Sequence, residues 1–598
     1  MDASAGVAPR CSSSVQSHAR SLCKIGCCFL SFLLLCMSSQ TATSGASVSD
    51  EYSKYLRARS EVGALKADDM FGDRIGLFTG SLEFVQKDVS IPGNNALEVA
   101  IQRKLRAGSQ GASGLFAEWD LAIPTIHGVF SEQGGWKNWT TEPFNRCSKF
   151  KPPPEESVTV YNITQRFQND EFWQGVFLYL PTSGDEDVLE VGTTGWMKPS
   201  NGYNYPLRTK SGAAIRCILA ENGTEEAFEV VTPEGITYRL NHMASRMVPA
   251  VTKAVDPGGC CISGPIYFDL RRREYFLLPT LASDRFGNTV TYSWSSTEPW
   301  QLTQISSSDG RVLDVTTVTG PSSPRITQVR SGSLTWNYEY ATGGLSKVIL
   351  PDQTSWEFTP GLTTNSLGSG STPTERSHCL SPGDPTYARS GTMKHPSGAV
   401  AIFSIAPTLH GRSWSTYNCD TVQGTSAFDR SSEQFPAKYY LWSLTKKQIS
   451  GAGVPAPYVW TYTYGPDNGC YAGNELASRN CIESSLTTKW VDVKDPEGVI
   501  TRYTFGNRFW VDEGYLLNIS KPGQSITQSY ELNGAGPYPL YAGWSIQPGK
   551  GLGYFASKMV PLREKKIEQD GMVFSWRANS YDVQARPISI TRSSGPAP

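Results

Sequence analysis

Residues 284–358 consist of short strand-like segments joined by tight-turn residues, and this pattern restricts the fold more than any other feature of the sequence. Apolar and hydroxyl-bearing side chains alternate over residues 289–294, which is the two-residue period of a half-buried β-strand. Asp309-Gly310 follows, and its glycine supplies the positive φ angle that a hairpin turn needs. Alternation resumes at 312–315. This order of strands and turns predicts hairpins that follow one another along the chain.

The end of the same stretch carries a pair of aromatic residues and two further turns. Tyr338 and Tyr340 are separated by one residue, so both side chains are expected on one face of a strand. Gly344 is expected to turn the chain. Pro351 and Asp352 should end the next strand, because proline fixes φ and aspartate favours turns. A tyrosine-bearing strand, a glycine turn, an apolar strand and a Pro-Asp turn therefore form one unit of a predicted β-meander.

This unit resembles the repeat of RHS (YD-repeat) proteins, in which a tyrosine-aspartate strand, a glycine turn, an apolar strand and a Pro-Asp-Gly turn follow one another. The tyrosine pair and the Pro-Asp turn described above occupy the corresponding places. Ala341 stands where the family has aspartate, and Gln353 stands where its last turn has glycine. Two neighbouring turns are also typical of the family, and their residues are Asp284, Gly287, Asn288, Asp309 and Gly310.

A second match lies nearer the N-terminus, in residues 71–105. There Gly80-Ser81 precedes alternating apolar residues, and Pro92-Gly93-Asn94 provides a turn before the alternation resumes. The order of these elements resembles the leader region that precedes the repeats of bacterial RHS proteins. Strand and turn patterns of the same kind return later in the chain, at 391–412, 439–464 and 495–517.

The resemblance implies an all-β protein, an irregular array of antiparallel hairpins that forms a spiral or curved sheet of the RHS type. Each hairpin leaves unpaired backbone groups at its edge, and the next hairpin satisfies them. The predicted regions are a signal peptide (1–46), a polar N-terminal arm (47–69), a β-rich leader region (70–280), RHS-like repeats (281–360), a Gly/Ser/Pro-rich loop (361–390) and a second RHS-like region (391–598).

The N-terminal residues have the pattern of an export signal. Basic residues precede the apolar run 25–37, which is too short to span a bilayer, and small residues end at Ala46, the expected cleavage site. A buried core helix is the alternative interpretation of the run. The sequence therefore predicts an exported protein that is periplasmic, bound to the cell surface or secreted, without a membrane span once the signal is removed.

Cysteine usage agrees with export. Of 13 cysteines, five lie in the predicted signal peptide, and the remaining eight are an even number, as expected for disulfides in an exported protein. Cys470 with Cys481, and Cys379 with Cys419, are the expected local pairs. The adjacent Cys260 and Cys261 are each expected to have a distant partner, which leaves the pairing open for these two residues and for Cys147 and Cys217.

The sequence contains no signature of catalysis or metal binding. It has no GxSxG, P-loop or HExxH motif and no CxxC or HxxxH spacing, so no catalytic, cofactor or metal residue is predicted. A net charge of −1 gives no general attraction to nucleic acid or to an anionic membrane. Residues 184–187 (Gly-Asp-Glu-Asp) are expected at a solvated hairpin tip rather than around calcium.

The resemblance to RHS proteins implies an exported scaffold without catalytic activity, forming part of a shell or carrier for a secreted polymorphic toxin. The expected partner is a passenger toxin polypeptide or a downstream RHS fragment, and the chain is expected to be a truncated or orphan copy, with a short surface protein as the alternative. A carbohydrate- or cell-surface-binding module is the second hypothesis, because the aromatic rings of 119–173 and 439–464 could stack on sugars. A polysaccharide-active enzyme with two carboxylates in a cleft is the third.

Overall fold

The computed structural model describes residues 70–108, 114–136, 145–173, 175–191, 198–255, 266–319, 324–341, 344–359, 361–363, 387–415, 437–473, 480–483, 486–534, 536–549 and 553–597. All of them belong to one unit, Leu56–Pro598. The predicted signal peptide with its cleavage site Ala46 and the N-terminal arm lie outside the described residues. So do Cys260, Cys261, Cys379 and Cys419, and most of the predicted loop 361–390.

Strands are almost the only regular secondary structure of the described residues, and α4 (Asn169–Phe172) is a single helical turn. No helix in the described part of the chain is long and apolar enough to cross a membrane. A small antiparallel sheet comprises β1 (Asp73–Gly76), β2 (Ser81–Ile91), β3 (Val99–Arg106) and β4 (Asp120–Leu121). A separate hairpin comprises β6 (Glu156–Val160) and β7 (Ile163–Phe167).

The large sheet contains the remaining strands. They are β5 (Thr125–Ser131), β8 (Phe177–Leu180), β9 (Gly184–Asp187), β10 (Leu189–Glu190), β11 (Leu207–Arg208), β12 (Ala214–Leu219), β13 (Glu226–Val231), β14 (Thr237–Val255), β15 (Ile266–Ser283), β16 (Thr289–Trp294), β17 (Leu302–Ser307), β18 (Val312–Thr319), β19 (Pro324–Ser331), β20 (Leu334–Ala341), β21 (Gly344–Ile349), β22 (Ser355–Thr359), β23 (Arg389–Lys394), β24 (Val400–Gly411), β25 (Lys438–Ser450), β26 (Tyr458–Tyr464), β27 (Thr488–Lys494), β28 (Ile500–Gly506), β29 (Leu516–Lys521), β30 (Gln524–Tyr530), β31 (Tyr541–Gly549), β32 (Gly553–Lys558), β33 (Leu562–Gln569), β34 (Met572–Tyr581) and β35 (Pro587–Pro596).

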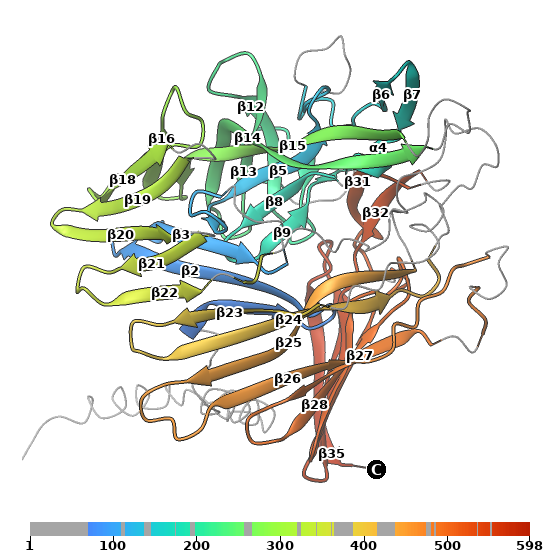
Figure 1. Cartoon of the computed structure of the whole chain (residues 1–598). Coiled ribbons are helices and arrows are strands. Elements are labelled where there is room, and N and C mark those ends of the chain that lie inside the picture. Colours follow the sequence, from blue (N-terminus) through green and yellow to red (C-terminus); the bar gives the residue numbers. More distant parts are fainter. Residues whose placement is uncertain are drawn as a thin grey trace, which may run out of the picture. The chain divides into compact units, whose positions relative to one another are not determined.

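Strands of the large sheet pair in chain order. Each strand from β10 to β30 is antiparallel to the next, and β33, β34 and β35 continue the sheet from β30 (Figure 1). Strand β5 pairs with β15 on one side and with β8 on the other, and β8 pairs with β9. The β31–β32 hairpin pairs with β10 through β31. The predicted all-β array of antiparallel hairpins is confirmed.

The small sheet packs on one face of the large sheet, which we call the inner face. Small-sheet residues Phe84, Val99 and Ile101 are fully buried in this core. They share it with large-sheet residues from β16 to β26, including Val290, Ile305, Leu313, Val329, Leu345 and Phe403, all 0% exposed. Figure 1 shows the blue strands β2 and β3 lying against the green to orange strands. Burial of each such side chain stabilises the fold by about 1.5–3 kcal/mol.

A second core holds two of the four tryptophans that the sequence clusters between 119 and 173. Trp136 and Trp173 pack with Phe130 and Phe228 between β5, β12 to β15 and α4, and they are 4% and 0% exposed. Trp119 is 1% exposed and belongs to the first core. Trp139 lies outside the described residues. The three described tryptophans of the cluster are thus core rather than surface.

Eight turns of the large sheet share one hydrogen-bonding pattern. The N–H of the first residue donates to the carbonyl of the fifth, and the N–H of the fourth residue donates to the carbonyl of the first. The fourth residue always has a positive φ, between 63° and 106°. These turns span 209–213, 232–236, 284–288, 307–311, 350–354, 395–399, 495–499 and 582–586. The first seven follow odd-numbered strands of a chain-ordered antiparallel sheet, so they lie at the same edge.

Glycine occupies the fourth position in six of these turns, and the other two contain Gln353 (φ 69°) and Ala585 (φ 63°). The substitution of glycine by Gln353 that the sequence revealed therefore leaves the turn geometry unchanged. A residue with a Cβ atom in this left-handed conformation costs roughly 1–2 kcal/mol.

We expect Gln353→Gly and Ala585→Gly each to raise the free energy of unfolding by about 0.5–1 kcal/mol. Glycine removes the steric cost of the left-handed conformation in the folded state, which raises the free energy of unfolding. It also increases the entropy of the unfolded chain, which lowers the free energy of unfolding by a smaller amount. Urea denaturation of the two variants should show a higher midpoint at an unchanged slope. Gly310→Gln introduces the same strain at φ 90° and should lower the midpoint. A lower midpoint for both glycine variants would contradict the strain argument.

Candidate functional site

The residue that connects the two sheets most extensively is Arg311, which is 9% exposed and ends the turn 307–311. Its guanidinium donates all five of its hydrogen bonds within 3.2 Å. The acceptors are the carbonyl oxygens of Ile91 and Leu97 and the side-chain oxygens of Asn95, Ser307 and Asp309. We call Arg311, Asp309 and the loop 91–97 the Arg311 clamp.

Asp309 forms the second half of the clamp. Its Oδ2 accepts hydrogen bonds from the backbone N–H of Asn94 (3.3 Å) and from the side-chain amide of Asn95 (3.1 Å). A Cβ atom on Gly93 would lie 2.3 Å from the Arg311 guanidinium, so a larger residue does not fit there. The Arg311 guanidinium holds the pKa of Asp309 well below its usual range. Two motifs that lie far apart in the sequence, Pro-Gly-Asn and Asp-Gly, therefore meet in the fold.

Two buried ion pairs lie between the same sheets. Arg103 of β3 bonds Asp88 of β2 at 2.8 Å, and both side chains are 0% exposed. The Arg103 guanidinium lies 4.4 Å from the Trp119 ring and 4.5 Å from the Phe358 ring, which belongs to the large sheet. Lys447 of β25 pairs with Asp73 of β1, and these side chains are also buried. Removing one partner of such a pair leaves an uncompensated charge and costs about 3–5 kcal/mol.

A buried hydrogen-bonded chain fixes the turn between β1 and β2. The Ser443 hydroxyl donates to the Thr79 carbonyl (2.6 Å), and His410 Nε2 lies 2.9 Å from that hydroxyl oxygen. Lys489 Nζ lies 3.3 Å from His410 Nδ1. Burial, and then the Lys489 ammonium, lower the pKa of His410 to about 3, so the ring is neutral and Nε2 carries the proton. Sequence reasoning missed this Ser-His pair, and because Ser443 is 0% exposed its role here is to hold the turn.

His127 of β5 lies between two carboxylates. Its Nδ1 is 2.9 Å from Glu274 Oε1 on β15, and its Nε2 is 3.0 Å from Asp185 Oδ1 on β9. Burial alone would lower the pKa of His127, but the hydrogen bonds to Asp185 and Glu274 raise it above its ordinary value. Residues 184–187 form strand β9 directly after the hairpin turn that Leu180 and Gly184 close, and Asp185 and Asp187 are exposed, in line with the expected solvated hairpin tip. Asp185 is in addition held by His127.

We expect His127 to make stability depend on pH. Because its folded-state pKa is raised, its contribution is complete below about pH 6.5 and is lost as the pH rises through the folded-state value. The difference in free energy of unfolding between the wild type and His127→Gln should therefore shrink as the pH rises above about 6.5 in urea titrations. His395→Gln is the control, because burial lowers the pKa of His395 and its contribution should not shrink over that range. If the difference in free energy of unfolding between the wild type and His127→Gln did not change with pH, the claim that protonated His127 stabilises the fold would be wrong.

The predicted repeat residues build turns and strand contacts rather than one pocket. Asp284 Oδ1 accepts from the N–H groups of Phe286 (2.8 Å) and Asn288 (3.0 Å) beside Gly287, and Asp352 Oδ1 accepts from that of Thr354 (3.0 Å) beside Pro351. Gly310 has the positive φ that the sequence predicts. Among these positions, only Asp309 joins the Arg311 clamp.

The two tyrosines and Gly344 have separate structural roles. Tyr338 is 4% exposed, and its ring lies 4.9 Å from that of Phe116. Tyr340 is half-buried and donates its hydroxyl hydrogen bond to a backbone carbonyl. Gly344 begins β21 without a positive φ, and a Cβ atom there would collide with the Glu118 carboxylate. Glycine is therefore needed at position 344 because the Glu118 side chain approaches the backbone closely, not because the chain turns there.

Tyrosine hydroxyls repeat one contact along the large sheet. In four hairpins of the described residues, a tyrosine near the end of one strand donates to a backbone carbonyl of the preceding strand, which lies near the start of that strand in three of them and in the middle of β25 in the fourth. These pairs are Tyr340 with Ile326, Tyr464 with Leu444, Tyr530 with Leu516, and Tyr581 with Leu562. The sequence analysis missed Tyr530 and Tyr581, although Tyr581-Asp582 is a literal tyrosine-aspartate pair.

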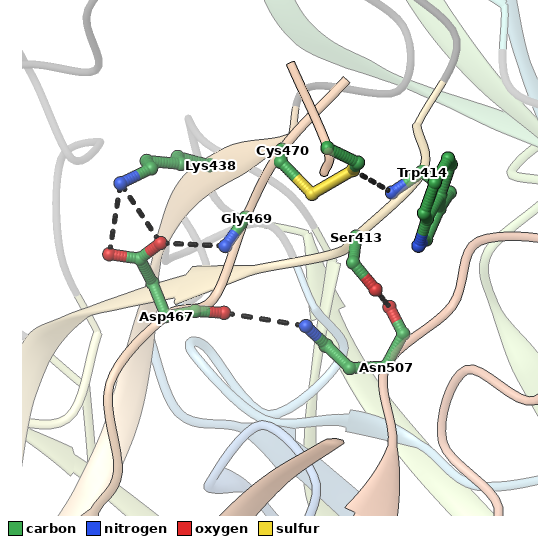
Figure 2. Close-up of a disulfide and its surroundings, with 8 residues drawn as sticks. Ser413, Trp414, Lys438, Asp467, Gly469, Cys470 and Asn507 are labelled. Atoms are coloured by element: carbon green, nitrogen blue, oxygen red, sulfur yellow. Dashed lines mark hydrogen bonds and ion pairs between the residues drawn. A yellow bond between two sulfur atoms is a disulfide. The ribbon is translucent and has the colours of Figure 1, made fainter. Parts of the chain in front are cut away.

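Two disulfides lie within the described residues. Cys470–Cys481 is present as predicted, and Cys147 pairs with Cys217. Figure 2 shows that Cys481 accepts a hydrogen bond from the N–H of Trp414 (3.0 Å), while Ser413 bonds Asn507 nearby. Asp467 accepts from Lys438 and from the N–H of Gly469. These bonds join three long connections at the edge opposite the repeated turns.

No protein-family model matches this chain, and no curated protein matches its sequence. Among solved structures, the crystal structure of TcdB2-TccC3 is 8% identical with a TM-score of 0.21, and the match covers 88% of this chain and 37% of that one. The N-terminal domain of effector protein SpvB from Salmonella typhimurium strain LT2 is 10% identical with a TM-score of 0.15, covering 64% and 94%. This chain thus spans a little over a third of TcdB2-TccC3, and at these TM-scores the likenesses support no inference about function.

Proposed function

We propose that this chain is an exported scaffold of the RHS type whose large sheet holds a passenger polypeptide, and that it has no catalytic activity of its own. The observation that carries the proposal is an apolar row on the inner face of β29, β30 and β33, formed by Ile519, Ile526 and Ile567, which we call the isoleucine row. The repeated turns and tyrosine contacts agree with the sequence resemblance to RHS proteins.

Strand register places the isoleucine row on the inner face. Tyr464 packs against the first core and lies opposite Val491, and Val491 lies opposite Tyr503 on the next strand. Tyr503 lies opposite Ile519, which begins the row. Directly opposed residues of an antiparallel pair lie on one face of the sheet. The isoleucine row therefore lies on the same face that the small sheet covers at β16 to β26.

The isoleucine row is less buried than the same face beneath the small sheet. Its three side chains are half-buried, whereas Val290 and Ile305 are 0% exposed. The opposite face of these strands is polar, with Asn518, Thr527 and Lys566 as successive cross-strand neighbours. An extended apolar segment of another polypeptide would bury the row, as the small sheet buries the rest of the face, and the gain is about 25 cal/mol for each Å² of apolar surface.

The carbohydrate-binding hypothesis is not favoured. Trp119, Trp136 and Trp173 are buried and offer no face to a sugar. In the later segment the rings of Tyr458 and Trp460 are 6.5 Å apart with planes inclined by 57°, so they do not form a flat stacking platform.

We expect the purified chain to bind an unfolded polypeptide through the isoleucine row. Ile526→Asp and Ile567→Asp should each weaken binding of reduced, carboxymethylated α-lactalbumin about tenfold or more, because a carboxylate on that face would be desolvated. Isothermal titration calorimetry measures the affinity. Thr527→Asp changes the neighbouring residue on the polar face and should leave binding unchanged. Equal affinities for all three variants, with unchanged melting temperatures, would refute the proposed face.

A further inference from the structure

A pocket of about 340 Å³ lies between β3 of the small sheet and the strands β13 to β16 of the large sheet. Its volume is within the usual range for small-molecule sites, about 300–1,000 Å³. Leu97, Ile123 and Leu180 contribute apolar wall, and the aromatic side chains are Tyr238 and Tyr292. The isoleucine row does not contribute to the lining, so the pocket is independent of the proposed passenger surface.

Tyr292 is the more buried of the two tyrosines that line the pocket. It is 9% exposed, and within the described part of the chain its hydroxyl has no hydrogen-bond partner. A ligand atom in the pocket could supply the hydrogen bond that this hydroxyl lacks within the protein. The ring of Tyr238 is half-buried beside it, and its hydroxyl also lacks a partner among the described residues.

The charged groups of the pocket are both acidic. Glu98 and Glu234 line it, and none of its lining residues is a lysine, arginine or histidine. Glu98 pairs with Lys87 at 2.6 Å beside the pocket, whereas Glu234 has no ion pair within the described residues. Burial, and then the carboxylates of Glu98 and Glu234, raise the pKa of Tyr238 to about 12.

The fixed charges of the lining are all negative. The Gln102 side-chain amide donates to Glu98 Oε2 at 2.9 Å, and the hydroxyls of Tyr238, Tyr292, Thr182 and Thr232 can each donate or accept a hydrogen bond. A neutral sugar would gain hydrogen bonds but no charge attraction here, and an anion would be repelled by the two carboxylates. A cation is attracted both by the carboxylates and by the faces of the tyrosine rings.

We propose that this pocket binds a small organic cation, an ammonium group on an apolar stem. The ammonium group is held by the carboxylates of the rim and by the tyrosine hydroxyls, and the stem lies along Leu97 and Ile123. The acidic rim and apolar wall select this class over neutral polyols and over anions.

Isothermal titration calorimetry of the purified chain with n-hexylamine tests the assignment, with n-hexanol, hexanoate and maltose as comparison ligands. We expect 1:1 binding of hexylamine, and hexanol binding about tenfold weaker or more because it lacks the charge. Glu234→Gln should weaken hexylamine binding about tenfold, and Tyr292→Phe should weaken it several-fold while keeping the ring. Glu339→Gln, an exposed glutamate on β20 outside the pocket, should leave the affinity unchanged.

Preference for hexanol or maltose, absence of hexylamine binding, or an unchanged affinity in Glu234→Gln would overturn the proposal. Glu234 lies at an exposed turn, so its substitution is expected to preserve the fold. If the melting temperature of Glu234→Gln nevertheless falls, Glu98→Gln provides the second variant, and hexylamine should again bind about tenfold more weakly.

Discussion

The buried guanidinium of Arg311 is the contact on which the join between the two sheets depends. A meander of hairpins buries one face only when a second layer covers it, and here that layer is the small sheet formed by β1 to β4. Arg311 fixes the loop of that sheet through the carbonyls of Ile91 and Leu97. The buried Lys447–Asp73 ion pair crosses the same interface, and Arg103, which pairs with Asp88 inside the small sheet, packs its guanidinium against Phe358 of the large sheet. Removing one partner of such a pair would leave an uncompensated charge in the interface.

The covered and uncovered parts of the inner face have different consequences. Where the small sheet lies, Val290 and Ile305 are fully buried and the strands form a two-layer core. Beyond β28 the same face continues with Ile519 and Ile526, which are only half-buried, while Thr527 faces the other way. The small sheet thus covers only part of the apolar inner face, while the opposite face of the uncovered strands is polar. This uncovered apolar part is the physical basis of the proposed passenger surface.

Local features of this fold could be predicted from the sequence, and long-range ones could not. Alternation and turn residues such as Gly310 predict hairpins, because these signals act over a few residues, and Cys470 and Cys481 are close enough in sequence for their pairing to be expected. The meeting of Gly93 with Arg311 depends on which strands lie beside each other, which no single segment encodes. His127 and Asp185 likewise come together only through the register of β5, β8 and β9, so their pairing had no sequence signal.

Native-state hydrogen exchange of the wild type and of Arg311→Ala tests the central claim most directly. Loss of the guanidinium leaves two carbonyls without their donor, at a cost of about 1–3 kcal/mol for each group. If the sheets form one core fastened by Arg311, the amides of β2 and β3 lose protection together with those of β16 to β18. Loss of protection confined to the loop 91–97 would contradict this account, because the small sheet would then be held without the clamp.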